Sequence, residues 1–347
     1  MEVGDYFTMK PESIGPPEIY LGGKVSKNSM PNGVECYTYS ASQYVQNAVK
    51  NVEEYLKGRG MVLTQKARGP LSNDYRPEMD VSTVLGPEES SYYHSLIGML
   101  RWAVELGRID ITAEVSMMAS CLAMPREGHL QQVFHIFAYL KNKHNSRIAF
   151  DPTYPDIEDG EFIKRDWTNM YGDIREEIPE NAPEPMGKPF IIRAYVDADH
   201  AGERLTRRSR TGYVVFLNMA PVYWYSKKQA GVETSSFGSE FIAMKQCCEY
   251  LKGLRYKLRM LGIPVGDPCY IYGDNQSVLS NVTVPDSVLK KKSNSVAYHY
   301  VREGVAKGEW LMTYINTKRN PADILSKNMR SGKERDLKMK MLMYDIT

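Results

Sequence analysis

The chain has 347 residues, of which 42% are hydrophobic, so it is long enough for roughly two domains and apolar enough for packed cores. Its five cysteines show no paired spacing, which indicates reduced intracellular thiols and argues against a disulfide framework. The sequence contains no apolar run of membrane-spanning length and no basic, apolar signal sequence at its N-terminus, so we expect a soluble protein.

The formal net charge of +2 conceals an asymmetry between the two halves of the chain. Residues 186–347 hold 26 Lys and Arg against 15 Asp and Glu, whereas residues 1–185 hold 18 against 27. A basic C-terminal half suggests a polyanionic partner. A solvated, lysine-rich surface is the alternative, and charge alone does not decide between the two.

The first 150 residues are predicted to be mainly helical. Residues 11–25 contain a turn that leads into a short strand pair, and residues 60–87 carry several Pro and Gly and are predicted to form a loop. Apolar residues recur at helical spacing in four stretches, which together suggest a small helical bundle. These stretches are residues 40–58, 90–106, 111–124 and 129–143.

Residues 151–187 interrupt this pattern. They hold 11 acidic residues against three basic ones, contain several prolines and show little hydrophobic periodicity. Such a composition indicates an exposed, mobile linker or a long surface excursion, and we place the boundary between two domains here.

The order of the elements after residue 187 predicts an α/β domain with a mixed sheet. Three strands come in succession, which favours an antiparallel meander, and helices separate the later strands, which favours parallel crossovers. The predicted strands are residues 190–196, 211–217, 222–226, 269–272 and 310–315. The predicted helices are residues 237–261, 276–281, 295–306 and 321–328.

The first of these strands ends abruptly in two carboxylates, Asp197 and Asp199, with a glycine shortly after them. Because residues two apart on a strand point to the same face, these acids are expected side by side where the hydrophobic sheet meets solvent. Paired carboxylates at such a strand end suit a divalent cation. A strand followed by an ordinary polar turn is the alternative, since Asp and Gly are common turn residues.

Three further acids lie at the junctions of predicted elements. Asp274 follows a strand and precedes a helix, while Glu240 and Asp323 lie in the first turns of helices, where an acid can simply complement the helix dipole. Together with Asp197 they could surround two divalent cations about 3.5–4 Å apart, one activating water and the other stabilising the leaving oxygen of a phosphodiester. Oxygen-only ligands favour Mg²⁺ or Mn²⁺ over Zn²⁺.

Several ordered motifs between residues 190 and 329 are typical of one family. They are Tyr-Val-Asp-Ala-Asp-His-Ala-Gly, Arg-Ser-Arg-Thr-Gly-Tyr, Trp-Tyr-Ser-Lys-Lys-Gln, Ser-Ser-Phe-Gly-Ser-Glu-Phe, Gly-Asp-Asn-Gln-Ser and Asn-Pro-Ala-Asp-Ile-Leu-Ser-Lys. Through them this region resembles the RNase H domain of copia-type LTR retrotransposon Pol polyproteins. The resemblance implies an RNase H-like mixed five-stranded sheet with flanking helices, preceded by a mainly helical region.

The resemblance also implies an activity, namely metal-dependent endonucleolytic cleavage of the RNA strand of RNA/DNA hybrids, with two Mg²⁺ or Mn²⁺ ions as cofactors. It makes Asp199 a supporting acid and places Gln276 near the RNA strand. The catalytic and metal-binding acids that it implies are the same four that their positions suggest: Asp197, Glu240, Asp274 and Asp323.

The first 150 residues resemble, less specifically, the segment that follows the polymerase palm in the same polyproteins and includes the primer-gripping hairpin, thumb and connection. The chain has no Tyr-x-Asp-Asp polymerase motif, and residues 195–199 only mimic it because an alanine intervenes. We therefore expect no polymerase activity from this chain alone, and the remaining polymerase domains of such a polyprotein are candidate partners. The motifs that carry this resemblance are residues 16–22, 93–98, 107–111 and 125–129.

An RNA/DNA hybrid fits the resemblance best as substrate, because such domains read duplex shape and 2′-hydroxyls and not sequence. His200 is expected at the rim of the site, and His299 is a weak candidate for aiding product release. Basic residues around the predicted site are candidate phosphate contacts, with solubilising surface as the alternative for each. They are Arg207, Arg208, Arg210, Lys227, Lys228 and residues 290–292.

Two other functions remain open. The chain could be a catalytically inactive hybrid-binding remnant, or a reverse transcriptase fragment that needs palm and fingers in trans. We expect it in the cytoplasm or in a virus-like particle, with the nucleus as an alternative. The expected division is a thumb- and connection-like region at 1–150, a linker at 151–187, an RNase H-like domain at 188–330 and a C-terminal tail at 331–347.

Overall fold

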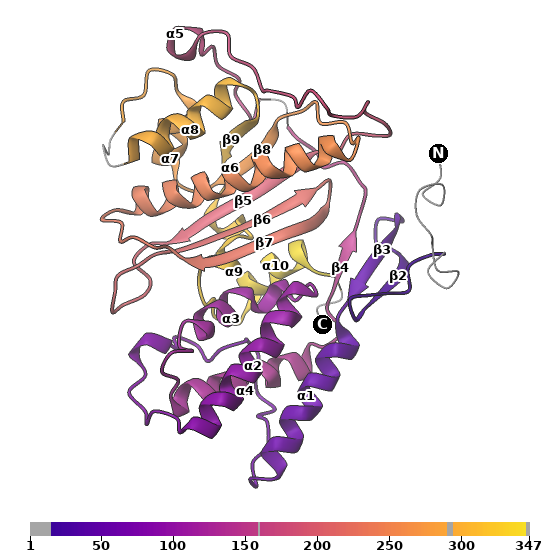
Figure 1. Cartoon of the computed structure of the whole chain (residues 1–347), viewed down its shortest axis with the longest axis vertical. Helices are drawn as coiled ribbons and strands as arrows, with labels where there is room; N and C mark the ends of the chain where they lie inside the picture. The colour runs from indigo at the N-terminus through magenta and orange to yellow at the C-terminus, as the bar shows by residue number, and fades with distance from the viewer. Residues whose placement is uncertain (1–14, 159, 290–293, 345–347) are drawn as a thin grey trace.

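The computed structural model describes residues 15–158, 160–289 and 294–344, so the predicted phosphate contacts at residues 290–292 lie outside the described residues. It contains two β-sheets, one of four strands and one of five (Figure 1). The smaller sheet lies in the N-terminal region, residues 15–150, and the larger one in the C-terminal region, residues 188–344.

The N-terminal region combines a helical bundle with a small antiparallel sheet. The four predicted helices form, and their apolar faces make a common buried core that includes Val52, Leu96 and Phe137. The predicted strand pair is confirmed, but the sheet also contains two strands that were not predicted. The first of them extends the pair as a local hairpin, and the second pairs with it from more than 100 residues away. The elements are β1 (Ile19–Tyr20), β2 (Gly23–Ser29), β3 (Glu35–Ser40), α1 (Ser42–Lys57), α2 (Pro87–Glu105), α3 (Thr112–Ala119), α4 (Glu127–Asn142) and β4 (Arg147–Phe150).

The C-terminal region contains the expected RNase H-like mixed sheet, so the predicted α/β fold class is confirmed. Its strand order is β7-β6-β5-β8-β9. The first three strands along the chain pair antiparallel, and the last two join in parallel, as the order of elements predicts. The strands are β5 (Ile192–Asp199), β6 (Arg210–Leu217), β7 (Ala220–Lys228), β8 (Cys269–Gly273) and β9 (Trp310–Tyr314).

Different elements cover the two faces of this sheet (Figure 1). The long helix α6 (Ser236–Met260) packs on one face, together with α7 (Gln276–Thr283) and α8 (Ser295–Ala306). The other face is covered by the short helix α9 (Asp323–Ser326), by α10 (Lys333–Leu342) and by the N-terminal region. Ile109 and Ile148 of the N-terminal region join Tyr195, Val214 and Met339 in one buried cluster, so the two regions share a core.

The predicted C-terminal tail is in fact a packed element. Residues 333–342 form α10, in which Arg335, Lys338, Met339 and Leu342 are buried. This helix was not predicted from the sequence, because it has no continuous apolar face. Two of its four buried side chains, those of Arg335 and Lys338, are positively charged, and a hydrophobicity pattern predicts that charged side chains are exposed to solvent.

Residues 151–187 form an excursion over the C-terminal region, and the division into domains at this segment stays a prediction. Among the described residues of this segment, Thr168–Tyr171 form a short helix, α5. Phe162 packs edge-on against Tyr270 and Tyr272, with ring centroids 4.9 and 5.2 Å apart. Trp167 is buried in the core cluster that includes residues of α6 and α8, and the Arg302 guanidinium of α8 lies 4.7 Å from the centre of its ring. Of the two alternatives, a surface excursion therefore describes the segment better than a connecting linker.

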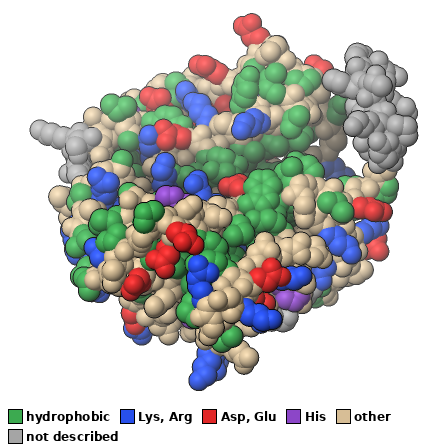
Figure 2. Space-filling model, turned by 60° about the horizontal axis from the view of Figure 1, so that its bottom comes forward, with side chains coloured by type: hydrophobic (Ala, Val, Ile, Leu, Met, Phe, Trp, Pro, Cys, Tyr) green, Lys and Arg blue, Asp and Glu red, His purple; other side chains and the backbone are tan. Residues whose placement is uncertain are grey.

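The surface of the molecule mixes charges of both signs. On the face shown in Figure 2, acidic and basic side chains alternate with small apolar patches. The excess of acids in the first half of the sequence therefore does not form a single acidic field on this face. Within the described ranges, none of the helices combines the length and apolar character that crossing a bilayer requires.

Glu176 holds the excursion against α6. We predict that Glu176→Gln lowers the free energy of unfolding by about 3 kcal/mol, because the buried Arg255 loses its charge partner. Both oxygens of Glu176 accept hydrogen bonds from Arg255 and Arg259 at 2.6–2.8 Å. Although burial opposes ionisation, these arginines lower the pKa of Glu176 to about 2. Urea unfolding of both proteins at pH 7 measures the difference.

Because this pKa is lowered, the contribution of Glu176 is present above about pH 4.5 and is lost as the pH falls towards 2. The difference between wild type and Glu176→Gln should shrink over that range. Glu177→Gln, which changes the exposed neighbouring acid, is the matched control and should behave as wild type. Equal stability of Glu176→Gln and wild type at pH 7 would contradict the anchoring role.

Candidate metal centre

A glycine on β6 allows the elements of the site to approach one another. Asp197 lies in β5 and is 3% exposed. Its cross-strand partner on the neighbouring strand β6 is Gly212. A Cβ atom on Gly212 would lie 2.6 Å from the amide nitrogen of Ser326 and 2.9 Å from the carbonyl oxygen of Ala322. Only glycine therefore lets the backbone of α9 rest directly on the sheet beside Asp197.

The loop that enters α9 is held by Asn320. Its side-chain amide donates to the Val196 carbonyl oxygen at 2.9 Å, and its side-chain oxygen accepts from the Ala322 amide at 3.1 Å. Asp323 begins α9, as predicted, and is 1% exposed. At the other end of the helix, the Ser326 hydroxyl donates to the Asp197 carboxylate. These contacts hold the backbone of α9, which carries Asp323, beside β5.

The predicted acids converge from four elements. Asp274 follows β8, the parallel neighbour of β5, and carboxylate oxygens of Asp197, Asp274 and Asp323 all lie within 4.8 Å of one another. Glu240 lies one residue further into α6 than predicted, at the start of the second turn, because the helix begins at Ser236. It interacts electrostatically with Asp197 and Asp274, so it lies near these two acids, but it is not one of the three whose oxygens lie within 4.8 Å of one another.

Assembling these acids perturbs their ionisation. Burial raises the pKa of Asp197 to about 7, with Asp323 and Asp274 adding to the effect and Lys327 opposing it. Burial also raises the pKa of Glu240 well above its usual value, and the carboxylates of Asp197 and Asp274 add to this increase. Without a cation, part of this cluster is therefore protonated near neutral pH.

Two lysines bring positive charge to the cluster. The ammonium of Lys327 lies 2.7 Å from Asp323 Oδ1 and 3.5 Å from Asp197 Oδ2. Lys338 of α10 forms an ion pair with Asp323 Oδ2. Both oxygens of Asp323 thus have a cationic partner, and the space between Asp197 and Asp323 favours positive charge.

The donor set fits a hard divalent cation. The group that could hold an ion consists of aspartates, whose oxygens are the ligands that Mg²⁺ and Mn²⁺ prefer. Burial and mutual repulsion make ionised carboxylates here unfavourable unless positive charge is bound, and a divalent cation can replace the protons. The residues that would hold it are Asp197, Asp274 and Asp323, with Glu240 beside them.

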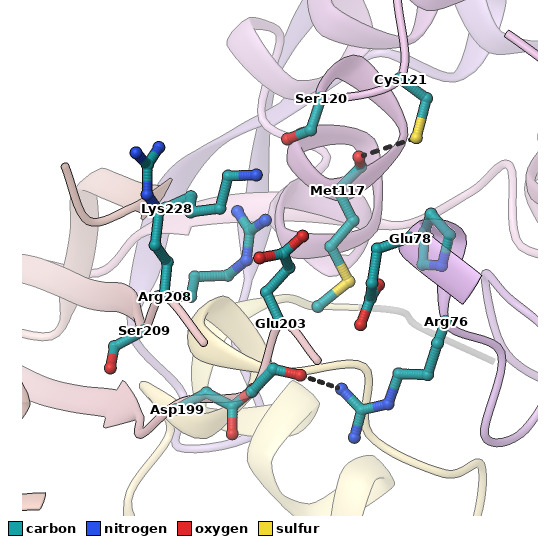
Figure 3. A pocket seen from close by; sticks show the side chains of 13 residues that line it. Arg76, Glu78, Met117, Ser120, Cys121, Asp199, Glu203, Arg208, Ser209 and Lys228 are labelled. Carbon is teal, nitrogen blue, oxygen red and sulfur yellow. Dashed lines mark hydrogen bonds between the residues drawn. The ribbon is translucent and has the colours of Figure 1, made fainter. Parts of the chain in front are cut away.

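A pocket lies next to this cluster, where the N-terminal and C-terminal regions meet. Its lining includes Asp199, Arg76 from the N-terminal region, and Arg208 and Lys228 from the C-terminal region. Figure 3 shows Arg208 and Lys228 on one side of the pocket and Arg76 on the other. Burial raises the pKa of Asp199, while Arg76 and Lys327 oppose the increase. Glu78 and Glu203 also line this pocket, so its charge is mixed. Asp199 lies in this pocket and outside the aspartate group.

Several relatives of this sequence are polyproteins of transposons. The chain is 27% identical over 274 residues to the retrovirus-related Pol polyprotein from transposon RE1 of Arabidopsis thaliana, which covers 78% of this chain and 16% of the relative. It is 26% identical over 325 residues to the corresponding polyprotein from transposon TNT 1-94 of Nicotiana tabacum, covering 92% of this chain and 21% of the relative. The chain is a homologue of copia-type Pol polyproteins. It spans only a small part of each relative's length.

Other comparisons add little to this homology. No family model matches this chain. RNase H1 from Halobacterium salinarum NRC-1 aligns with a TM-score of 0.31 and 17% identity, covering 39% of this chain and 93% of that chain. The fold class of this chain therefore rests on the order and direction of the strands in its own sheet.

The residues predicted to contact phosphates lie in different environments in this chain. Arg207 and Lys227 are exposed, and Gln276 is exposed at the start of α7, away from the pocket that contains Asp199. Arg210, in contrast, is 7% exposed and donates to the Ser116 hydroxyl at 2.6 Å. Arg210 therefore joins β6 to the N-terminal region, and its prediction as a phosphate contact is not supported.

The two singled-out histidines lie apart. His200 Nδ1 is 3.2 Å from the Ser239 hydroxyl oxygen, at the end of β5 as expected of a rim residue. His299 lies in α8, on the α6 face of the sheet, and its Nδ1 is 2.8 Å from the Tyr171 hydroxyl oxygen of the excursion. Among the described contacts of His299 there is none to the acids, so its suggested part in product release gains no support.

Sequence reasoning missed several residues of the site. Asn320, Ser326 and Lys327 belong to a motif that was used only for its aspartate, and the spacing of four residues between Asp323 and Lys327 is a signal for an ion pair on a helix. Lys338 lies beyond the motifs, and no local pattern connects it with Asp323.

We predict that Gly212→Ala destabilises the chain by about 1–3 kcal/mol, because the added methyl group overlaps the backbone of α9, which is not free to move aside. Urea unfolding measures the effect. Gly253→Ala is the matched control, since Gly253 lies on the exposed side of α6 with open space around its Cβ position. That variant should be as stable as wild type or more so. A Gly212→Ala protein of wild-type stability would contradict the close approach of α9.

Proposed function

We propose that the chain is an RNase H-type ribonuclease that uses divalent cations to cleave the RNA strand of RNA/DNA hybrids within a retrotransposon's reverse transcription machinery. The observation that carries the proposal is the convergence of Asp197, Asp274 and Asp323 within 4.8 Å, with Glu240 beside them. Homology to Pol polyproteins supports the retrotransposon setting.

The acids would hold two Mg²⁺ or Mn²⁺ ions, which supply the charge that an in-line displacement at a phosphodiester requires. The residues of the chain prepare this site in advance. Ser326 orients the Asp197 carboxylate, and Asn320 holds the loop that carries Asp323. Such preorganised placement is a large part of catalysis by proximity.

The basic side chains in the mixed-charge pocket beside Asp199 support a nucleic acid substrate. Arg208 and Lys228 lie beside Asp199, which is two residues along β5 from Asp197, so a phosphodiester backbone held there passes close to the acids. Arg76 adds a cation from the N-terminal region. A duplex that contacts both regions at once fits a hybrid recognised by shape. The remaining polymerase domains of a Pol polyprotein are the proposed protein partners.

A second candidate function is binding of a hybrid without cleavage. One observation favours it, namely that both oxygens of Asp323 pair with ammonium groups, from Lys327 and Lys338. If these lysines kept a cation out, the acids would be assembled but inactive. Cleavage of a labelled hybrid by the purified chain in Mg²⁺ separates the two functions.

We predict that Asp197→Asn and Asp274→Asn each reduce cleavage of the RNA strand below detection, because each removes a cation ligand. The fold should persist, since Asp197 already carries a proton part of the time at neutral pH and asparagine has nearly the same shape. The measurement is cleavage of a labelled hybrid in Mg²⁺, with circular dichroism to check the fold. Asp286→Asn, at an exposed acid, is the control and should cleave normally. Full activity of either site variant would refute the site.

We also predict that hybrid binding weakens with salt through release of counterions, and that Arg208 and Lys228 carry part of this dependence. Replacing both by alanine should reduce the slope of log affinity against log salt by about 2, since each phosphate contact contributes about 0.9. Binding is measured in EDTA, so that no cleavage occurs. Lys57→Ala, on an exposed face of α1, is the control. An unchanged slope in the double variant would exclude these residues as phosphate contacts.

A further inference from the structure

Helix α10 carries two buried cations close together. Lys338 is fully buried, and Arg335, one turn before it, is 2% exposed. Burying a charged side chain costs several kcal/mol unless partners compensate it. The partners of these two side chains therefore show what this helix does.

Lys338 is directed towards the proposed cation site. An ammonium group has three N–H donors, and in Lys338 each of them has a partner. They donate to the Thr317 carbonyl oxygen at 3.0 Å, to a carboxylate oxygen of Glu334 at 3.1 Å and to Asp323 Oδ2. Because the ammonium group is buried and each of its N–H groups already donates a hydrogen bond, Lys338 is a lasting partner of Asp323 that does not exchange with water.

Arg335 is directed towards the N-terminal region. Its guanidinium donates to the Asp110 carbonyl oxygen at 2.7 Å and to the Tyr139 hydroxyl at 3.4 Å, and it lies 5.5 Å from the centre of the Tyr139 ring. Asp110 precedes α3 and Tyr139 lies in α4. One turn of α10 thus joins the N-terminal region to an acid of the site.

The two lysines on Asp323 differ in their access to solvent. The side chain of Lys327 is 35% exposed and meets Asp323 Oδ1, whereas that of Lys338 is fully buried and meets Oδ2. Oδ1 is therefore the oxygen that can change partners, and Oδ2 is the one held in place. With Oδ2 held, Oδ1 shares the Lys327 ammonium with Asp197 Oδ2.

We propose that Lys338 is a positioning residue for the cation site: it holds the Asp323 carboxylate so that one oxygen faces Asp197 and Asp274. Through Arg335, the docking of α10 makes this geometry depend on the N-terminal region. The proposal rests on the cation site of the proposed function, but not on cleavage. It also implies that a fragment that ends at residue 330 lacks part of its own site.

The test is binding of Mn²⁺ alone to the full-length chain, measured by titration calorimetry. Lys338→Met removes the ammonium but keeps the length of the side chain, and should weaken Mn²⁺ binding by about 10–100-fold, the usual effect of losing a residue that orients a metal ligand. Lys338→Gln keeps one N–H donor for Asp323 and should lie between Lys338→Met and wild type. Arg335→Met should weaken binding in the same direction, to a smaller extent.

Lys340→Met is the matched control, because Lys340 is an exposed lysine of the same helix, and it should bind Mn²⁺ as wild type does. Circular dichroism identifies the variants that fold. If Lys338→Met does not fold, Lys338→Gln and Arg335→Met provide the comparison. Wild-type or tighter Mn²⁺ binding by the folded variants would overturn the proposal, and so would a wild-type chain that binds no Mn²⁺. A wild-type chain that binds Mn²⁺ but cleaves no hybrid would refute the ribonuclease while leaving the role of Lys338 intact.

Discussion

The structure depends on balancing charge where several carboxylates are buried together. Asp197 and Asp323 are almost completely withdrawn from water, and ionised carboxylates in such a place are costly unless protons, ammonium groups or metal ions neutralise them. This chain uses the first two means, since the pKa of Asp197 is raised and Asp323 pairs with two lysines. A divalent cation would be the third means of balancing the same charges.

The balancing charges come from parts of the chain that the domain division separates. Lys338 lies beyond the RNase H-like domain expected from the sequence, and Arg335 ties the same helix to the N-terminal region. Ile109 and Ile148 of that region also pack under the sheet that carries Asp197. The two regions are therefore best understood as one packed unit, in which the helical region supports the site as well as extending the surface offered to nucleic acid.

Sequence alone predicted what depends on local pattern. The period of two places Asp197 at the end of an apolar strand, and the alternation of strands and helices predicts the mixed sheet; both follow from a few consecutive residues. The contacts of Lys338 and the pairing of β4 were missed because they join segments far apart in the chain. Gly212 shows an intermediate case, since its motif was recognised but its purpose appears only when α9 lies against it.

The central claim is that a divalent cation binds among these aspartates while α10 holds Asp323 in place. A crystal structure of the chain soaked with Mn²⁺, with anomalous data recorded near the manganese edge, tests it most directly. We predict an anomalous peak in contact with Asp197, Asp274 and Asp323, and an Asp323 carboxylate that remains paired with Lys338. A peak elsewhere, no peak at all, or a Lys338 side chain detached from Asp323 would contradict the account.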